Sequence, residues 1–234
     1  MESRLPVLRC LLVAGIATSI AAVELRIEDI RLSYAYLPDS ASDVQGDSER
    51  FAADGSLTSS GTLYMVGLDQ PRQRVSLGWF HALRAMEAGR GSLVLGFEAI
   101  YDLRDDSRRL EQEALIADAF VGWAWPLSPN WHIEQGFVIG GGVQRNTFAL
   151  RPTEAGPGPV FSGEDETFVL EYGIRIGARW THDSGFQAGI DISYLVQHSE
   201  VDASLTTSDG ERLEYQPEIR QEGFAFAAVA GYRL

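Results

Sequence analysis

Hydrophobic and polar residues alternate along several long stretches of this chain. The clearest stretch runs from Phe186 to Tyr194, where every second residue is apolar and the residues between them are Gln, Gly, Asp and Ser. A period of two residues is typical of a β-strand with two different faces, because successive side chains point to opposite sides. No convincing helical stripe occurs. The pattern predicts an all-β protein built from antiparallel strands.

The alternation recurs along the chain and predicts about eight strands. Their expected ranges are 24–36, 60–83, 92–103, 112–125, 130–149, 166–181, 186–200 and 219–234. The second range contains Pro71, which we expect at a bulge or in an exposed part of the strand, since proline has no N–H to donate to a ladder. If Pro71 instead marks a turn, the count becomes nine.

Short and long connections alternate between the predicted strands. Short links rich in turn residues lie at 86–89, 126–129 and 182–185, and longer polar links lie near 38–57, 104–111, 151–165 and 200–218. Transmembrane barrels of the bacterial outer membrane have short periplasmic turns and longer extracellular loops. The order therefore predicts a single antiparallel up-and-down transmembrane β-barrel with its N- and C-termini on the periplasmic side.

The first residues have the composition of an export signal. Arg4 and Arg9 form a positively charged region before an apolar run, from Leu11 to Val23, that is too short for a transmembrane helix and ends in small residues. Ser19 and Ala21 fit the small-x-small cleavage rule, so we expect residues 1–21 to be a cleaved signal peptide and residues 22–234 to form the barrel. An uncleaved anchor is the alternative. Cys10 falls inside the signal, so the mature chain would contain no cysteine.

The chain ends in an alternating strand, from Phe224 and Phe226 to Tyr232 and Leu234. Together with the strand pattern of the whole mature chain, this ending resembles the small outer-membrane β-barrel family of the OmpA and OmpX type. The resemblance implies a Gram-negative outer-membrane location and a C-terminal strand that the barrel-assembly machinery recognises. The family's usual final aromatic residue is replaced here by Leu234.

Alternation alone does not tell which face meets lipid, because a soluble ligand-binding barrel alternates too, with its apolar face inward. The tryptophans favour a membrane protein, since all of them fall near the short turns. Amphipathic rings at one level around a barrel wall are typical of a girdle at the membrane interface. The predicted girdle comprises Trp79, Trp123, Trp125, Trp131, Trp180 and Tyr232.

If the apolar face meets lipid, the charged residues of the strands point inward. An eight-stranded lumen is only wide enough for side chains, so we expect a network of arginines and carboxylates with Arg175 and Arg179 as its hubs. The predicted network comprises Glu98, Asp118, Glu134, Glu171, Arg175, Arg179 and Asp191, with Asp29 and Arg31 as companions. Such a network would plug the barrel. A proton or ion relay is the functional alternative.

The chain is acidic, with 33 Asp and Glu against 19 Lys and Arg. This balance argues against a nucleic-acid partner, because phosphate binding needs clustered positive charge. Carboxylates crowd the predicted long loops, where divalent cations could bridge them to lipopolysaccharide, although a solvated acidic surface is the simpler interpretation. The sequence contains no calcium-loop motif, and we expect neither a metal nor a cofactor. Gly140, Gly141 and Gly142 indicate a bend or a close approach to a bulky lumen side chain.

Three classes of function fit this pattern. The favoured one is a non-enzymatic structural or interaction barrel in contact with outer-membrane lipid and lipopolysaccharide, and a narrow channel or receptor is the second. The third is an enzyme that modifies outer-leaflet lipid, for which His198 at the outer rim is the one catalytic candidate. His198 and Ser199 would project to opposite faces of a strand and could pair only if the strand had ended there.

Overall fold

The computed structural model describes residues 28–38, 41–65, 71–83, 91–104, 109–151 and 160–234. These residues form an antiparallel β-structure of eleven strands, so the all-β fold class is confirmed. The strands are β1 (Asp29–Leu37), β2 (Ala41–Phe51), β3 (Leu57–Met65), β4 (Arg72–Ala82), β5 (Ser92–Arg104), β6 (Leu110–Pro126), β7 (Trp131–Leu150), β8 (Phe161–Thr181), β9 (Phe186–Glu200), β10 (Ala203–Thr206) and β11 (Arg212–Arg233). No helix among the described residues is long and apolar enough to cross a membrane. The expected signal peptide lies outside the described residues.

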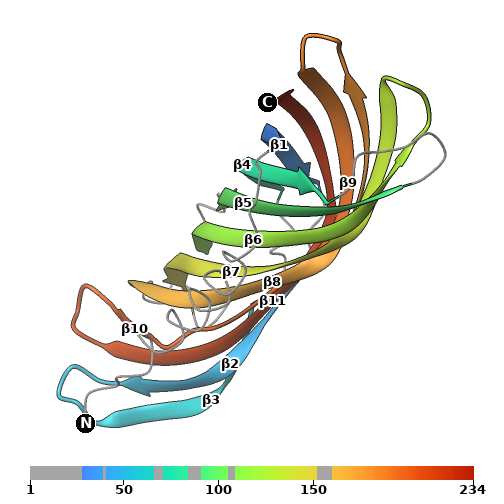
Figure 1. Ribbon diagram of the computed structural model, residues 1–234. Coiled ribbons are helices and arrows are strands. Elements are labelled where there is room, and N and C mark those ends of the chain that lie inside the picture. Colours follow the sequence, from blue (N-terminus) through green and yellow to red (C-terminus); the bar gives the residue numbers. More distant parts are fainter. Residues whose placement is uncertain (1–27, 39–40, 66–70, 84–90, 105–108, 152–159) are drawn as a thin grey trace.

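Eight of these strands pair in a closed order. β1 pairs with β4, and the pairing continues through β5, β6, β7, β8, β9 and β11, which pairs with β1 again. Figure 1 shows these strands as a curved wall, with the C-terminus and β1 near one end of the molecule. Pairing of this kind satisfies the backbone N–H and C=O groups of each strand on both sides.

The remaining strands lengthen this wall at the end opposite the C-terminus (Figure 1). β2 pairs with residues 212–222 of β11, and β3 pairs with β2. β10 pairs with β11 and meets β8 at one position. We call β2, β3, β10 and the adjoining ends of β6, β7, β8 and β11 the extension.

The strand count exceeds the expected eight for local reasons. β2 and β10 lie in stretches predicted as loops, and the strand predicted at 60–83 is two strands, β3 and β4, with Pro71 outside both. β10 keeps the register of β9, since Glu200 pairs with Glu218 and Ala203 pairs with Tyr215. The interruption between them lies opposite Pro217, which has no N–H for the ladder.

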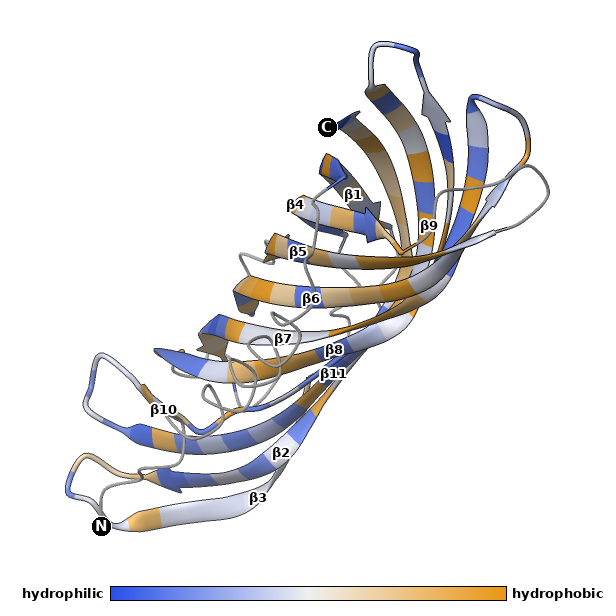
Figure 2. Cartoon of the chain, viewed as in Figure 1, coloured by the Kyte–Doolittle hydropathy of each residue, from blue (hydrophilic) through white to orange (hydrophobic). Residues whose placement is uncertain are grey.

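The strands of the extension reverse the distribution of polar and apolar residues. Along the outer face of β11, the charged residues from Arg212 to Glu222 give way to Phe224 and Phe226, which are about half exposed. On the inner face of β11, the large buried apolar residues Tyr215 and Ile219 of the extension are followed by small residues in the ring. Figure 2 shows the same change in hydropathy along the molecule.

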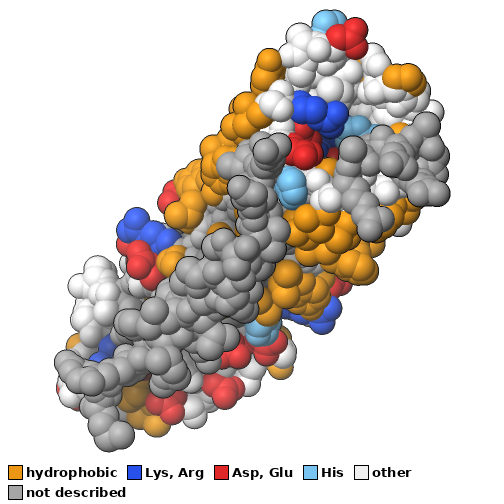
Figure 3. All heavy atoms as spheres, in the orientation of Figure 1, with side chains coloured by type: hydrophobic (Ala, Val, Ile, Leu, Met, Phe, Trp, Pro, Cys, Tyr) orange, Lys and Arg blue, Asp and Glu red, His pale blue; other side chains and the backbone are white. Residues whose placement is uncertain are grey.

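Other strands make the same change at matching positions. On the outer face, Glu113 of β6 is followed by Leu115, Arg145 of β7 is preceded by Val143, and Glu166 of β8 is followed by Phe168. Leu115 pairs with Val143, which pairs with Phe168, so the three changes lie at one level of the wall. In Figure 3, hydrophobic side chains gather mainly on the upper half of the visible face and acidic side chains on its lower end.

The extension has an apolar core of its own. Phe148, Phe161, Leu205 and Tyr215 are at most 1% exposed within it, and the rings of Phe148 and Tyr215 meet edge to face at 6.1 Å. β8 begins at Phe161 and β11 at Arg212, earlier than the predicted starts at 166 and 219, because the strand conformation directs the apolar residues of these segments into the core. The links predicted near 38–57, 151–165 and 200–218 therefore contain strand residues.

Candidate functional site

The predicted network residues all lie on the inner face of the ring. Cross-strand register aligns them, since Glu98 pairs with Asp118, Asp118 with Gly140, and Gly140 with Glu171. Six of the seven residues are at most 8% exposed, and the side chain of Arg175 is 10% exposed. Buried charges of this kind are tolerated only when they are paired and hydrogen-bonded.

One group of ion pairs lies near the short turns. Arg31 of β1 donates to both carboxylate oxygens of Glu134, from Nη1 to Oε2 at 2.6 Å and from Nη2 to Oε1 at 2.7 Å. Its Nη2 also donates to Asp29 Oδ2 at 2.9 Å. His132 Nε2 lies 3.1 Å from Glu134 Oε1, so this histidine points inward and contacts the network.

Arg179 of β8 completes this group from the other side of the lumen. Its Nη2 lies 2.6 Å from Asp191 Oδ1 on β9 and 3.9 Å from Glu134 Oε2. The separation from Glu134 is too long for a hydrogen bond. Asp191 is therefore the principal partner of Arg179.

Arg175 lies next to two aromatic rings. Its Nη1 donates to Glu98 Oε2, and its guanidinium lies 4.4 Å from the ring centroid of Phe120 and 5.4 Å from that of Phe80. Arg31 lies 4.1 Å from the same Phe80 ring. Stacking on aromatic faces stabilises a desolvated guanidinium, so the two rings contribute to holding both arginines inside.

A second group of ion pairs lies toward the extension. Arg74 of β4 donates to both oxygens of Glu171, at 2.9 and 2.5 Å, and to Asp102 Oδ2 at 2.8 Å. Arg72 also pairs with Asp102, and its Nη2 donates to Gln197 Oε1 at 2.5 Å. Gln197 Nε2 in turn donates to Glu171 Oε2 at 2.7 Å. The residues of this group come from four different strands, β4, β5, β8 and β9.

The arginines with the most carboxylate contacts differ from the expected hubs. Arg31 and Arg74 each donate to two carboxylates, whereas Arg175 donates to Glu98 alone. Sequence reasoning missed Arg72 and Arg74 because the segment around Pro71 has no clear strand register. The sequence does contain the pattern that would have identified them, since Arg72, Arg74 and Ser76 share one face of β4 and the apolar Val75 and Leu77 lie on the other.

A layer of amides separates the second group from the apolar core of the extension. Gln112 Nε2 and Gln144 Nε2 donate to Asn146 Oδ1 at 2.9 and 2.7 Å, and Gln221 donates to Gln112. The interior thus changes in order from ion pairs to amides to apolar side chains.

Between the two ion-pair groups lies a cavity of about 40 Å³. Its charged lining residues are Arg74, Glu98, Asp118, Glu171, Arg175 and Asp191. Gly140 allows this arrangement, because a Cβ at that position would lie 1.9 Å from Asp118 Oδ1. The close approach predicted at Gly140 is thus to a carboxylate rather than to a bulky side chain.

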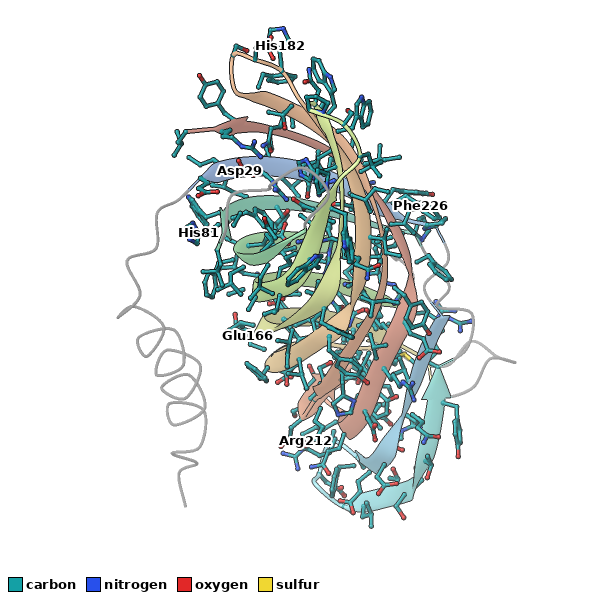
Figure 4. All side chains as sticks on the ribbon, turned by 45° about the vertical axis from the view of Figure 1, so that its right-hand side comes forward. Asp29, His81, Glu166, His182, Arg212 and Phe226 are labelled. Carbon is teal, nitrogen blue, oxygen red and sulfur yellow. The ribbon has the colours of Figure 1, made fainter. Side chains whose placement is uncertain are left out.

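The predicted girdle residues lie on the outer wall at the turn end of the ring. Trp131 pairs with Trp180, and Tyr232 pairs with both Ile30 and Phe186. Trp79, Trp123, Trp125, Trp131 and Tyr232 are between 36% and 50% exposed, and Trp180 is half-buried with its ring 5.6 Å from that of His182. In Figure 4 His182 lies at one end, Glu166 and Arg212 lie toward the other, and Phe226 points out of the wall.

Neither family models nor curated protein sequences match this chain. Its strand architecture is similar to outer-membrane β-barrels. Ail of Yersinia pestis is 13% identical, with 86% of this chain and 99% of that chain covered and a TM-score of 0.34. The translocator domain of the autotransporter NalP from Neisseria meningitidis is 8% identical over 97% of both chains, with a TM-score of 0.37. The outer-membrane protease OmpT from Escherichia coli is 10% identical over 91% of this chain and 99% of that chain, with a TM-score of 0.35.

His198 lies on the outer face of β9, at the level where the charged residues begin. Its Nδ1 is 3.5 Å from Glu218 Oε1 and its Nε2 is 4.0 Å from Glu200 Oε1. Ser199 is 3% exposed on the opposite face, because β9 continues to Glu200. The structure therefore brings His198 to carboxylates and away from this serine. Within the described ranges, no three His, Cys, Asp or Glu side chains are arranged to hold a metal ion.

Proposed function

We propose that this chain is an outer-membrane β-barrel protein whose lumen is closed by ion pairs and whose extension projects from the cell surface. The barrel would consist of the ring of eight paired strands, with both termini in the periplasm. Its role would be structural or interactive rather than enzymatic, in contact with outer-membrane lipid and lipopolysaccharide.

The observation that carries this proposal is the reversal of polarity along β11 and β8. In the ring, Phe226, Ile174 and Ile176 are about half exposed on the outside while charges are buried inside. In water this arrangement would expose a continuous apolar belt, whereas in a bilayer the belt would meet hydrocarbon. The extension has the arrangement of a water-soluble protein, with Phe148 and Tyr215 inside and carboxylates outside.

The direction of insertion follows from loop length and from the girdle. Short turns at 127–130 and 182–185 lie at the end that carries the tryptophans and the C-terminus, and short turns are periplasmic in this class of barrel. The extension would then lie outside the cell. We also propose that the C-terminal strand, which pairs along β9 and β1, is the part recognised by the barrel-assembly machinery.

Cell fractionation and gel mobility test this proposal. We expect the mature protein in the outer-membrane fraction, with a folded band on an unheated gel that shifts on boiling. Recovery of the protein from periplasmic extract without detergent would contradict it.

A narrow channel is the second candidate, and the cavity between the ion-pair groups favours it. Opening would require the pairs on either side of the cavity to separate. Planar-bilayer recordings distinguish the two proposals, since a plugged barrel gives no steady conductance. Conductance in the wild type that changes in Arg74→Ala would favour the channel.

A further inference from the structure

Asp118 differs from every other carboxylate inside the ring. The others each have an arginine nitrogen within 4.0 Å, and these pairs are Asp29 with Arg31, Glu98 with Arg175, Asp102 with Arg72, Glu134 with Arg31, Glu171 with Arg74, and Asp191 with Arg179. Asp118 has no such partner among the described residues, although it is only 3% exposed. No donor in the same residues reaches its Oδ1.

The strand register places a second carboxylate close to Asp118. Asp118 and Glu171 lie on the inner face on either side of Gly140, which has no side chain to separate them, and both line the same cavity. Two ionised carboxylates cannot hydrogen-bond to one another, because each has only acceptor oxygens. Their repulsion is also strong where water is scarce. One proton between them removes both problems.

The proton belongs on Asp118 rather than on Glu171. Glu171 accepts two hydrogen bonds from Arg74 and one from Gln197, all of which favour its ionised form. We propose that Asp118 is a proton-binding site of the folded barrel, where its carboxylic O–H donates to Glu171.

The groups facing this site come from four strands. Arg74 lies on β4, Glu98 on β5, Glu171 and Arg175 on β8, and Asp191 on β9, all lining the same cavity. Arg175 and Arg74 pair with Glu98 and Glu171, and among the described residues neither forms an ion pair with Asp118 within 4.0 Å. The cavity of about 40 Å³ holds on the order of three water molecules, which provides a route for the proton to arrive or leave.

This site would keep the plug closed while Asp118 holds its proton. Loss of the proton at alkaline pH would place an unpaired charge beside Glu171 and weaken the contacts of Arg74. The inference concerns the interior of the barrel and does not depend on its membrane location, which fractionation tests separately.

Infrared spectroscopy of the full mature protein folded in detergent tests this inference. The wild type at neutral pH should have the C=O stretching band of a protonated carboxylic acid, and the band should be absent in Asp118→Asn. Asp191→Asn is the matched control, because Asp191 is buried in the same lumen but pairs with Arg179; its spectrum should keep the band. A wild-type spectrum without the band would overturn the proposal, whether or not the variants fold.

Chemical unfolding provides a second readout. Asp118→Asn should keep the urea midpoint of the wild type at neutral pH, since the asparagine amide can donate to Glu171 as the acid does. It should also remove the fall in midpoint that we expect for the wild type as the pH is raised. A wild-type midpoint that depends on sodium rather than on pH would show a bound metal cation in place of the proton and would overturn the proposal.

Discussion

Replacement of Arg74 by alanine tests whether buried ion pairs hold the barrel closed. The change removes three hydrogen bonds, two to Glu171 and one to Asp102, in a region where all three side chains are at most 7% exposed. Removing one partner of a buried pair leaves an uncompensated charge, at a cost of about 3 to 5 kcal/mol. We expect the free energy of unfolding to fall by about 3 kcal/mol, because Gln197 still donates to Glu171 and Arg72 still pairs with Asp102.

Arg145→Ala is the matched control. Arg145 pairs with Glu164 across β7 and β8, but the two side chains are 50% and 55% exposed. Pairs in water contribute at most about 1 kcal/mol, so this variant should unfold close to the wild type.

The assay is equilibrium unfolding in urea of protein folded into lipid vesicles, followed by the fluorescence of the wall tryptophans. The free energy of unfolding is compared among the wild type, Arg74→Ala and Arg145→Ala, with the slope against urea checked for constancy. Equal effects of the two substitutions would refute the idea that the interior pairs differ from surface pairs.

Three further substitutions test other parts of the structure. Ile174→Arg on the outer face of β8 should destabilise the protein in vesicles by about 2 to 4 kcal/mol, whereas Ser162→Arg on the same face within the extension should have little effect. Burial raises the pKa of Tyr215 to about 12, so the contribution of this residue to stability is complete below the ordinary tyrosine pKa of about 10 and is lost as the pH rises through about 12. Tyr215→Phe should reduce that alkaline loss in urea unfolding, and an unchanged pH profile would count against burial of the hydroxyl. Gly140→Ala should cost about 1 to 3 kcal/mol because its Cβ would lie 2.3 Å from the Ala117 carbonyl oxygen, whereas Gly61→Ala has open space and should be close to neutral; similar unfolding of the two would contradict the packing.

The alternation of residues predicted the strands of the ring but not the extension. In the ring, long apolar faces such as that of β8 coincide with strict alternation, and both the strand and its inward charges could be read directly. In the extension the apolar residues move to the inner face. Leu213, Tyr215 and Ile219 are separated by charged or polar residues, which resembles a polar loop unless the burial of those apolar residues is known.

The sequence pattern also predicted that the charged residues point inward, but it could not predict which of them form ion pairs. A strand pattern assigns Glu98 and Arg175 to the same face without giving the cross-barrel distance between them. Pairing of Arg31 with Glu134 joins residues that are 103 positions apart, and it depends on how β1 closes the ring. The isolation of Asp118 from arginine likewise follows from the positions of its neighbours in space.

Lipid contact along the outer face of β8 is the central claim, and site-directed spin labelling tests it most directly. The chain's only cysteine is Cys10, so in a protein that starts at Ala22 a single cysteine introduced at 162, 166, 170, 174 or 178 can be labelled alone. Accessibility to oxygen and to a water-soluble nickel complex is then compared in vesicles. We predict water contact at 162 and 166 and lipid contact at 170, 174 and 178. Equal water accessibility at all five positions would contradict the account.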